Sequence, residues 1–168
     1  YSGRLWTEEN GDDAFDEINQ PNPGFNGGWV QAMGPLSRVA QFREIETAPP
    51  NSLQQLRWPP DRIATDPNLA KRRMFVLPGS TYADPQFSWK YAIAVSGIAF
   101  VGSDALGAGH QGELWVTEGR TNLLGGYLMA FKLTPDRKSL SFSDPKLFDR
   151  VADNLAKFDA TESESLVI

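Results

Sequence analysis

The fold is decided by the stretch IAFVGSDALGAGHQGELWVTEGRTNLLGGYLMAFKLTPDRKSLSF, residues 98–142. It contains four short runs rich in apolar residues, separated by clusters of Gly, Asn, Asp and Pro, which is the pattern of strands joined by turns. The runs are 98–101, 113–117, 127–133 and 139–142. Successive strands with short connections form a meander, and a four-stranded meander is the unit of a β-propeller blade. This half of the chain therefore predicts an all-β fold.

The rest of the chain fits the same fold class. Further strand-like runs occur at 3–7, 73–77, 92–101 and 147–151, and helical spacing is confined to three short segments at 37–46, 52–57 and 151–158. The sequence Gly-x-Leu-Trp begins at Gly3 and again at Gly112, which suggests an internal repeat. We expect an all-β chain with short helical turns in its loops.

The composition limits the partners. The chain has 168 residues, 21 Asp and Glu against 16 Lys and Arg, and a longest basic run of only Lys71-Arg72-Arg73, which argues against binding to a nucleic-acid backbone. The longest apolar stretches, such as 92–95 and 98–101, are far shorter than the roughly 18–20 residues of a membrane span. The absence of cysteine excludes disulfides, zinc-thiolate sites and thiol nucleophiles.

Carboxylates are concentrated near the start of the chain. Six of them occur within residues 8–17: Glu8, Glu9, Asp12, Asp13, Asp16 and Glu17. They repel one another unless they are solvated or gather a cation, and Ca²⁺ prefers such oxygen ligands. The spacing is not that of an EF-hand, so a solvated acidic loop and a cation site remain the two alternatives.

His110 is the only histidine in the chain and lies in the glycine-rich stretch 107–112. A single histidine excludes a metal centre built from several histidines. The glycine spacing matches a dinucleotide-binding fingerprint, but a strand follows it where that fingerprint requires a helix. We therefore expect a flexible loop with His110 at its surface.

Three motifs in the first thirty residues resemble a known family. They are Leu-Trp-Thr-Glu-Glu-Asn-Gly at 5–11, Asp-Glu-Ile-Asn at 16–19 and Pro-Gly-Phe-Asn-Gly-Gly-Trp at 23–29. They resemble the Glu-(His/Asn)-Gly-Pro, Asp-Glu-Ile-Asn and Pro-Gly-x-Asn-x-Gly-Trp signature of the soluble quinoprotein glucose/sorbosone dehydrogenases. Segments 82–89, 92–100 and 112–116 are similar to the blade that follows in that family, so the resemblance runs in order over nearly the whole chain.

The resemblance implies a six-bladed β-propeller, of which this chain would supply about two to three four-stranded antiparallel blades. It implies an oxidoreductase that oxidises an aldose sugar or related alcohol with pyrroloquinoline quinone (PQQ) and Ca²⁺. The full-length protein would be periplasmic or secreted. By the resemblance, the backbone carbonyls of Gly11 and Asp12 would bind Ca²⁺, with Asp12 standing where the family has Pro, and Trp89 and Arg120 would contact the quinone.

The family's catalytic His, and an Arg that contacts its quinone, would both fall before Tyr1, and its next blade would fall after Ile168. The resemblance therefore predicts that residues 1–168 are a single propeller segment, truncated at both ends and without a catalytic residue of its own. We expect the isolated chain to be inactive and to associate with itself or with the missing blades, because cut blades expose apolar faces. The alternative is a noncatalytic propeller module that binds a carbohydrate or a protein partner.

Overall fold

The computed structural model describes residues 3–48, 62–119, 125–155 and 162–168. Its strands are β1 (Thr7–Glu9), β2 (Ala14–Asn19), β3 (Phe25–Asn26), β4 (Thr81–Tyr82), β5 (Phe87–Tyr91), β6 (Val95–Phe100), β7 (Leu114–Glu118), β8 (Leu128–Leu133), β9 (Leu140–Ser141) and β10 (Val151–Ala152). Its helices are α1 (Val39–Thr47) and α3 (Pro67–Arg73), with 3₁₀ turns η1 (Leu36–Arg38), η3 (Ala108–His110), η4 (Pro145–Leu147) and η5 (Glu164–Leu166). The described part of the chain is therefore rich in strands and has few helices.

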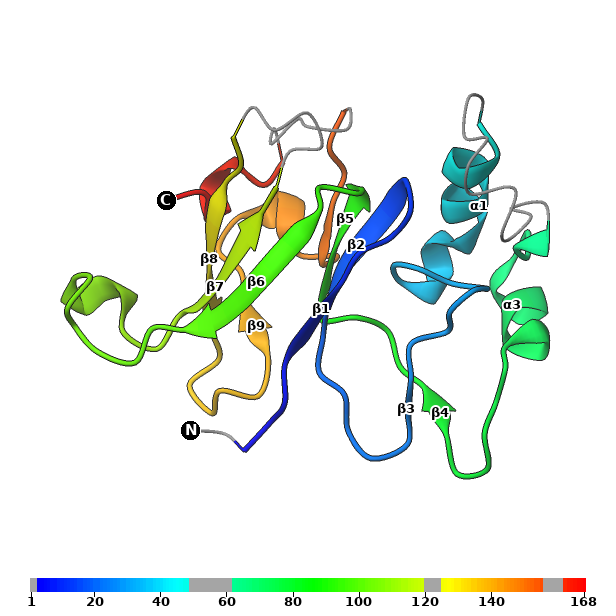
Figure 1. Cartoon of the computed structure of the whole chain (residues 1–168), viewed down its shortest axis with the longest axis horizontal. Helices are drawn as coiled ribbons and strands as arrows, with labels where there is room; N and C mark the ends of the chain where they lie inside the picture. Colours follow the sequence, from blue (N-terminus) through cyan, green and yellow to red (C-terminus); the bar gives the residue numbers. More distant parts are fainter. Residues whose placement is uncertain (1–2, 49–61, 120–124, 156–161) are drawn as a thin grey trace.

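One sheet is the predicted meander. Strands β6, β7, β8 and β9 pair in sequence order, and every pairing is antiparallel. The residues of β7 alternate between buried and more exposed positions, as expected for a strand with one face against a core. The prediction of consecutive antiparallel strands in residues 98–142 is confirmed (Figure 1).

The second four-stranded sheet has the order β1-β2-β5-β10. Strands β1 and β2 form an antiparallel hairpin, β2 pairs antiparallel with β5, and β10 adds parallel to β5. All six residues of β2 are buried. Strand β2 is therefore the central element of this half, with protein on both of its faces. A short parallel pair, β3 with β4, lies beside it.

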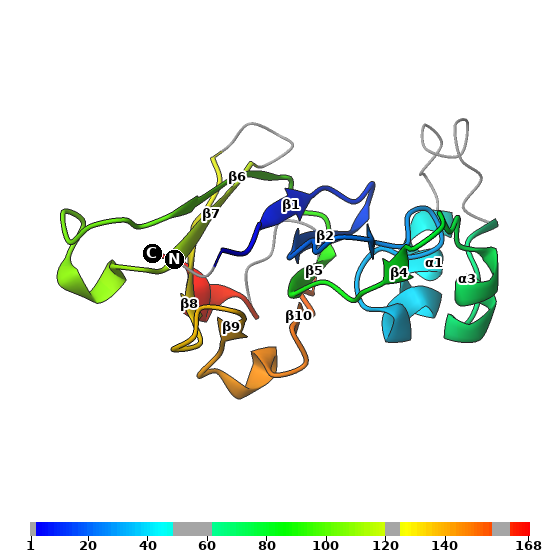
Figure 2. The same cartoon turned by 90° about the horizontal axis from the view of Figure 1, so that it is seen from below.

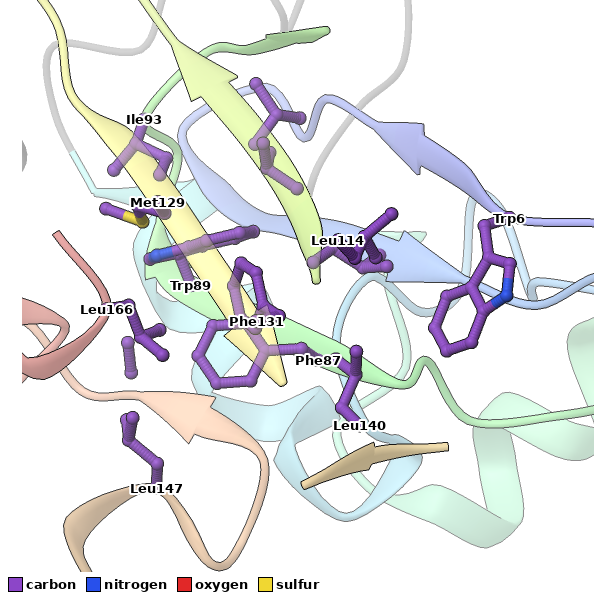
Figure 3. Close-up of a cluster of buried hydrophobic side chains, with 14 residues drawn as sticks. Trp6, Phe87, Trp89, Ile93, Leu114, Met129, Phe131, Leu140, Leu147 and Leu166 are labelled. Atoms are coloured by element: carbon purple, nitrogen blue, oxygen red, sulfur yellow. The ribbon is translucent and has the colours of Figure 1, made fainter. Parts of the chain in front are cut away.

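The main hydrophobic core lies between the two sheets. Aromatic rings from β5 and β8 meet there: Phe87 packs edge-on to Trp89 with a centroid distance of 4.8 Å and to Phe131 at 5.1 Å. Leu114 of β7 is fully buried in the same core (Figure 3). Ile18 of β2 is fully buried there too. Rings of this size contribute most of the apolar area that holds two sheets together.

A smaller second core joins β2 to the helices. Helix α1 turns Val39 and Phe42 toward Ala14 and Phe15 of β2, with the Phe15 and Phe42 rings in an edge-to-face contact. Helix α3 begins with Pro67 after Asp66, whose side chain accepts a hydrogen bond from the backbone of Leu69. Both helices lie beside β2 and away from the β6–β9 sheet (Figures 1 and 2).

Several local predictions differ from the structure. The strand predicted at 73–77 is absent. Arg73 ends α3, Met74 is buried in the second core, and Phe75, Val76 and Leu77 are exposed and pair with no strand among the described residues. The strand predicted at 3–7 begins only at Thr7, and residues 151–152, predicted to begin a helix, form β10. The helix predicted at 37–46 is confirmed, and the one at 52–57 lies outside the described residues.

Over the described ranges, no helix combines the length and the hydropathy that crossing a membrane would need.

Candidate functional site

The acidic motifs meet at the turn between β1 and β2, and Asp16 holds that turn in place. Its carboxylate is fully buried. Oδ1 accepts a hydrogen bond from the backbone N–H of Gly11 at 2.7 Å, and Oδ2 accepts from Ile93 at 2.7 Å and Val95 at 3.3 Å. Burial raises the pKa of Asp16, while these backbone donors oppose that rise. One carboxylate therefore joins the turn to the segment that leads into β6.

Gly11 is required by the close approach of the backbone inside this turn. A Cβ atom built at Gly11 would lie 1.9 Å from the carbonyl oxygen of Ala14, a distance that no side chain tolerates. The glycine of the Glu-Glu-Asn-Gly motif thus has a steric role in closing the turn.

Glu17 performs a similar task on the next segment. Its Oε1 accepts from the backbone N–H of Gly34, and its Oε2 accepts from the Asn19 amide at 2.8 Å. Burial raises the pKa of Glu17 to about 8; the hydrogen bonds from Asn19 and Gly34 oppose the rise, and the charges of Glu9 and Asp16 add to it. The Asp-Glu-Ile-Asn strand is thereby linked to the loop that follows the Pro-Gly-Phe-Asn-Gly-Gly-Trp motif.

A third carboxylate reaches the turn from helix α1. Glu46 is only 2% exposed, and its Oε1 accepts from the backbone N–H groups of Asp13 and Ala14, both at 2.9 Å. Burial raises the pKa of Glu46 to about 7 against the effect of these two donors, and the charges of Asp12 and Asp13 raise it further. No pattern in the sequence points to Glu46, because the contact joins positions more than thirty residues apart.

A tyrosine also holds the neighbouring loop. The Tyr82 hydroxyl donates to Oδ1 of Asp84 at 2.7 Å, and the same oxygen accepts from the backbone N–H of Leu36 at 2.7 Å. Burial, followed by the Asp84 carboxylate, raises the pKa of Tyr82, so the phenol remains protonated. The turn between β1 and β2 and the loop before α1 are both held by side-chain acceptors.

The carboxylates at 8–17 therefore divide into two kinds. Asp16 and Glu17 are neither solvated nor grouped as metal ligands, because each binds backbone N–H groups inside the protein. Asp12 is exposed at the tip of the turn, and Asp13 is half-buried beside it. Within the described ranges, no three His, Cys, Asp or Glu side chains converge as a metal centre would require.

The turn nevertheless has a donor set that suits Ca²⁺. Asp12 adds a carboxylate to the backbone carbonyls of residues 11 and 12, and hard oxygen donors of these two kinds are the ligands that Ca²⁺ takes. The carbonyl of Asp13 is not among them, because it accepts a hydrogen bond from the backbone N–H of Ala92 at 3.1 Å. The local potential is negative, as the upward effect of Asp12 and Asp13 on the pKa of Glu46 shows. Gly11 and Asp12 thus fit the calcium expected from the resemblance by their donor chemistry.

Of the two predicted quinone contacts, Trp89 does not join them. Trp89 is fully buried among Phe87, Phe131 and their neighbours, so its ring faces the hydrophobic core and no open site (Figure 3). A residue in this position does not fit as the wall of a quinone pocket. Arg120 lies outside the described residues.

His110 has a specific partner that its place in a glycine-rich loop did not reveal. Its Nδ1 lies 2.8 Å from Oε2 of Glu113, and the same oxygen accepts from the Trp115 indole N–H at 3.1 Å. Burial works against ionisation of Glu113, but the hydrogen bonds from Trp115 and His110 and the charges of His110 and Lys132 hold its pKa below the ordinary value. The 110–115 segment is thus anchored by a buried carboxylate.

Comparisons of the chain with protein-family models, with curated proteins and with solved structures found no match.

Proposed function

We propose that this chain is part of a β-propeller related to the quinoprotein glucose/sorbosone dehydrogenases, and that its β1–β2 turn contributes oxygen ligands to a Ca²⁺ site. The observation that carries the proposal is that buried carboxylates hold the backbone amides of the β1–β2 turn. Asp16 binds the Gly11 amide of the first motif, and Glu17 binds the Gly34 amide just beyond the third. Glu46, from helix α1, binds the amides of Asp13 and Ala14, so the same turn is also held by a residue distant in the sequence.

The physical argument for calcium is preorganisation. Asp16 binds the backbone N–H of Gly11, and Glu46 binds those of Asp13 and Ala14. These bonds fix the N–H groups inside the protein, so the turn does not turn them toward a cation. The exposed Asp12 side chain and the carbonyl oxygens of Gly11 and Asp12 are then the oxygen donors that we propose for the cation. A fixed arrangement of donors loses less entropy on binding a ligand than a mobile loop would.

A thermal unfolding measurement with metal ions tests this proposal. We expect millimolar Ca²⁺ to raise the melting temperature, since a ligand that binds the folded state alone stabilises it. Asp12→Asn removes the exposed carboxylate without altering the volume of the turn and should abolish most of that rise. Gly11 itself is unsuitable for substitution, because any side chain would collide with Ala14.

Asp104→Asn supplies the matched control, since Asp104 is an exposed carboxylate in the β6–β7 loop. We expect this variant to keep the full response to Ca²⁺. A melting temperature that Ca²⁺ leaves unchanged, or a response equal in Asp12→Asn and wild type, would contradict a calcium site at this turn.

A fluorescence experiment on the same protein distinguishes the oxidoreductase from the noncatalytic alternative. PQQ added with Ca²⁺ should quench tryptophan emission if the chain contributes to a quinone-binding face, whereas a module that binds a carbohydrate or protein partner should show no quenching at any Ca²⁺ concentration. Because Trp89 is fully buried, we expect no quenching of the emission of that residue. We expect no dye-linked oxidation of aldoses by the isolated chain, and measurable turnover would overturn that expectation.

A further inference from the structure

A second surface of the molecule has the opposite charge character from the acidic turn. A hollow of about 340 Å³ lies between the segment before β1, the end of β6 with the loop that follows it, and the turn between β8 and β9. Its lining includes Arg4, Arg137, Gln111 and Phe100. Among the described residues that line it there is no carboxylate, although acidic residues outnumber basic ones in the chain.

Arg137 is the central group of this hollow. It also lines an adjoining hollow of about 350 Å³, where Lys132 and Glu113 are the other charged residues, so Arg137 lies where the two hollows meet. The Glu113 carboxylate is already bound to His110 and to the Trp115 indole. Among the described residues, Arg137 forms no ion pair. A guanidinium with unused donors presents a planar fork that matches a carboxylate or a phosphate.

The backbone beside Arg137 leaves room for the guanidinium. Gly112 has a φ of +85°, and a Cβ built there would lie 2.9 Å from an Nη atom of Arg137. A larger residue at position 112 would displace the side chain. Asp136 stabilises the turn that carries Arg137, since its Oδ1 accepts from the Thr134 hydroxyl and from the backbone N–H of Lys138.

The other walls supply a second cation and an apolar face. Arg4 is positioned by its hydrogen bond to the side chain of Asn22. Phe100 is 46% exposed and packs edge-on to Trp6 with a centroid distance of 6.3 Å. The β6–β7 loop, which forms one rim, stands out from the sheet in both views of the molecule (Figures 1 and 2).

We propose that this hollow binds a small organic anion, with the carboxylate or phosphate of the ligand on Arg137 and its apolar body on Phe100. The volume is in the range of natural small-molecule pockets. Arg137, which forms no ion pair among the described residues, favours a ligand with an anionic group over a neutral one. This site is independent of the calcium proposal, because none of its lining residues belongs to the acidic turn.

Titration with three probes of similar shape tests the proposal: phenyl phosphate, benzoate and the neutral benzyl alcohol. The measurements are calorimetry at low ionic strength and the NMR shift of the Arg137 side-chain N–H. We expect one or both anions to bind with a dissociation constant of about 1 mM or tighter, and benzyl alcohol to bind at least tenfold more weakly. The stronger anion identifies whether the site prefers phosphate or carboxylate.

Arg137→Gln should weaken binding of the anion about tenfold or more, and Arg137→Lys should weaken it less, because the lysine keeps the charge and loses the fork. Arg72→Gln, a matched change on the exposed surface of α3, should leave binding within about twofold of wild type. If Arg137→Gln fails to fold, the NMR shift of the Arg137 side-chain N–H in the wild type, measured as the anion is added, decides whether the anion binds Arg137. Equal affinity for benzyl alcohol, no anion binding at 10 mM, or wild-type affinity in folded Arg137→Gln would overturn the proposal.

Discussion

At the scale of the residue, buried carboxylates act as acceptors for backbone N–H groups. Asp16, Glu17 and Glu46 together hold the amides of the β1–β2 turn, the entry to β6 and the loop before α1. A buried N–H group without a partner costs about 1–3 kcal/mol, and a carboxylate satisfies two or three at once. This explains why acidic residues occur in a strand that is buried on both faces.

Asp16→Asn tests this role directly. The variant keeps the size of the side chain but replaces one acceptor oxygen with an NH₂ donor, which must then face a backbone N–H. We expect the free energy of unfolding to fall by about 2–4 kcal/mol, measured by urea denaturation. Asp104→Asn, an exposed change of the same chemistry, should alter it by less than about 0.5 kcal/mol. Equal stability of the two variants would show that the Asp16 carboxylate is dispensable.

The raised pKa of Glu17 makes stability depend on pH. The folded protein keeps a proton on Glu17 up to about pH 8, whereas the unfolded chain releases it near 4.5. This contribution is complete below pH 4.5 and is lost as the pH rises to about 8, at up to about 1.4 kcal/mol per pH unit. Glu46, raised to about 7, acts in the same direction. We therefore expect urea midpoints to fall steadily from pH 5 to pH 8.

Glu17→Gln mimics the protonated acid and should flatten that decline. The buried Asn19 Oδ1 has no hydrogen-bond partner in the described part of the chain, so it would accept from the new amide once the Asn19 side chain turns over. The exposed Glu44→Gln variant should keep the wild-type slope. A slope unchanged by Glu17→Gln would assign the pH dependence to other groups.

At the scale of the element, helix α1 stabilises the hairpin through its last turn. Glu46 lies near the end of α1, and its bonds to Asp13 and Ala14 fix the start of β2. The apolar face of the same helix packs on Ala14 and Phe15. Polar and apolar contacts thus place one helix against one strand.

Glu46→Ala would leave the amides of Asp13 and Ala14 without their acceptor. We expect a loss of about 2–4 kcal/mol in the free energy of unfolding and faster hydrogen exchange at Ala14. The neighbouring Glu44→Ala, on the exposed side of α1, should change neither quantity appreciably. Unchanged exchange at Ala14 in Glu46→Ala would contradict the coupling of helix and strand.

At the scale of the whole molecule, two sheets share one aromatic core, while a separate apolar run stays outside it. Phe75, Val76 and Leu77 follow α3 and are 75%, 58% and 59% exposed. Contiguous exposed apolar residues of this kind are typical of surfaces that meet a partner. We propose that this run takes part in self-association of the chain.

Sedimentation velocity over a range of protein concentrations measures this association. We expect the sedimentation coefficient of the wild type to rise with concentration, and the double variant Phe75→Ser/Leu77→Ser to remain monomeric. Leu106→Ser, an equally exposed change in the β6–β7 loop, serves as the control and should associate as the wild type does. A monomeric wild type, or association that survives the double variant, would exclude this run as the contact.

The sequence by itself determined the β-rich class, the meander of β6 to β9 and helix α1, because each depends on local periodicity and turn residues. It also identified the motifs at 5–11, 16–19 and 23–29. Strand β2 was not predicted. A strand buried on both faces shows no alternation of polar and apolar residues, and its acidic residues suggested a loop. Helix α3 was missed because its seven residues are too few for a clear helical period.

Only the tertiary structure decided what the charged and aromatic residues do. Asp16 and Glu17 accept hydrogen bonds from backbone N–H groups, and Trp89 is a core residue. Arg137 lines a hollow together with Arg4. Each of these roles depends on contacts between segments that are distant in the sequence. Burial and hydrogen-bond partners, not residue type, set whether a carboxylate is solvated, protonated or bound. Those two quantities exist only after the chain has folded, so no local pattern in the sequence contains them.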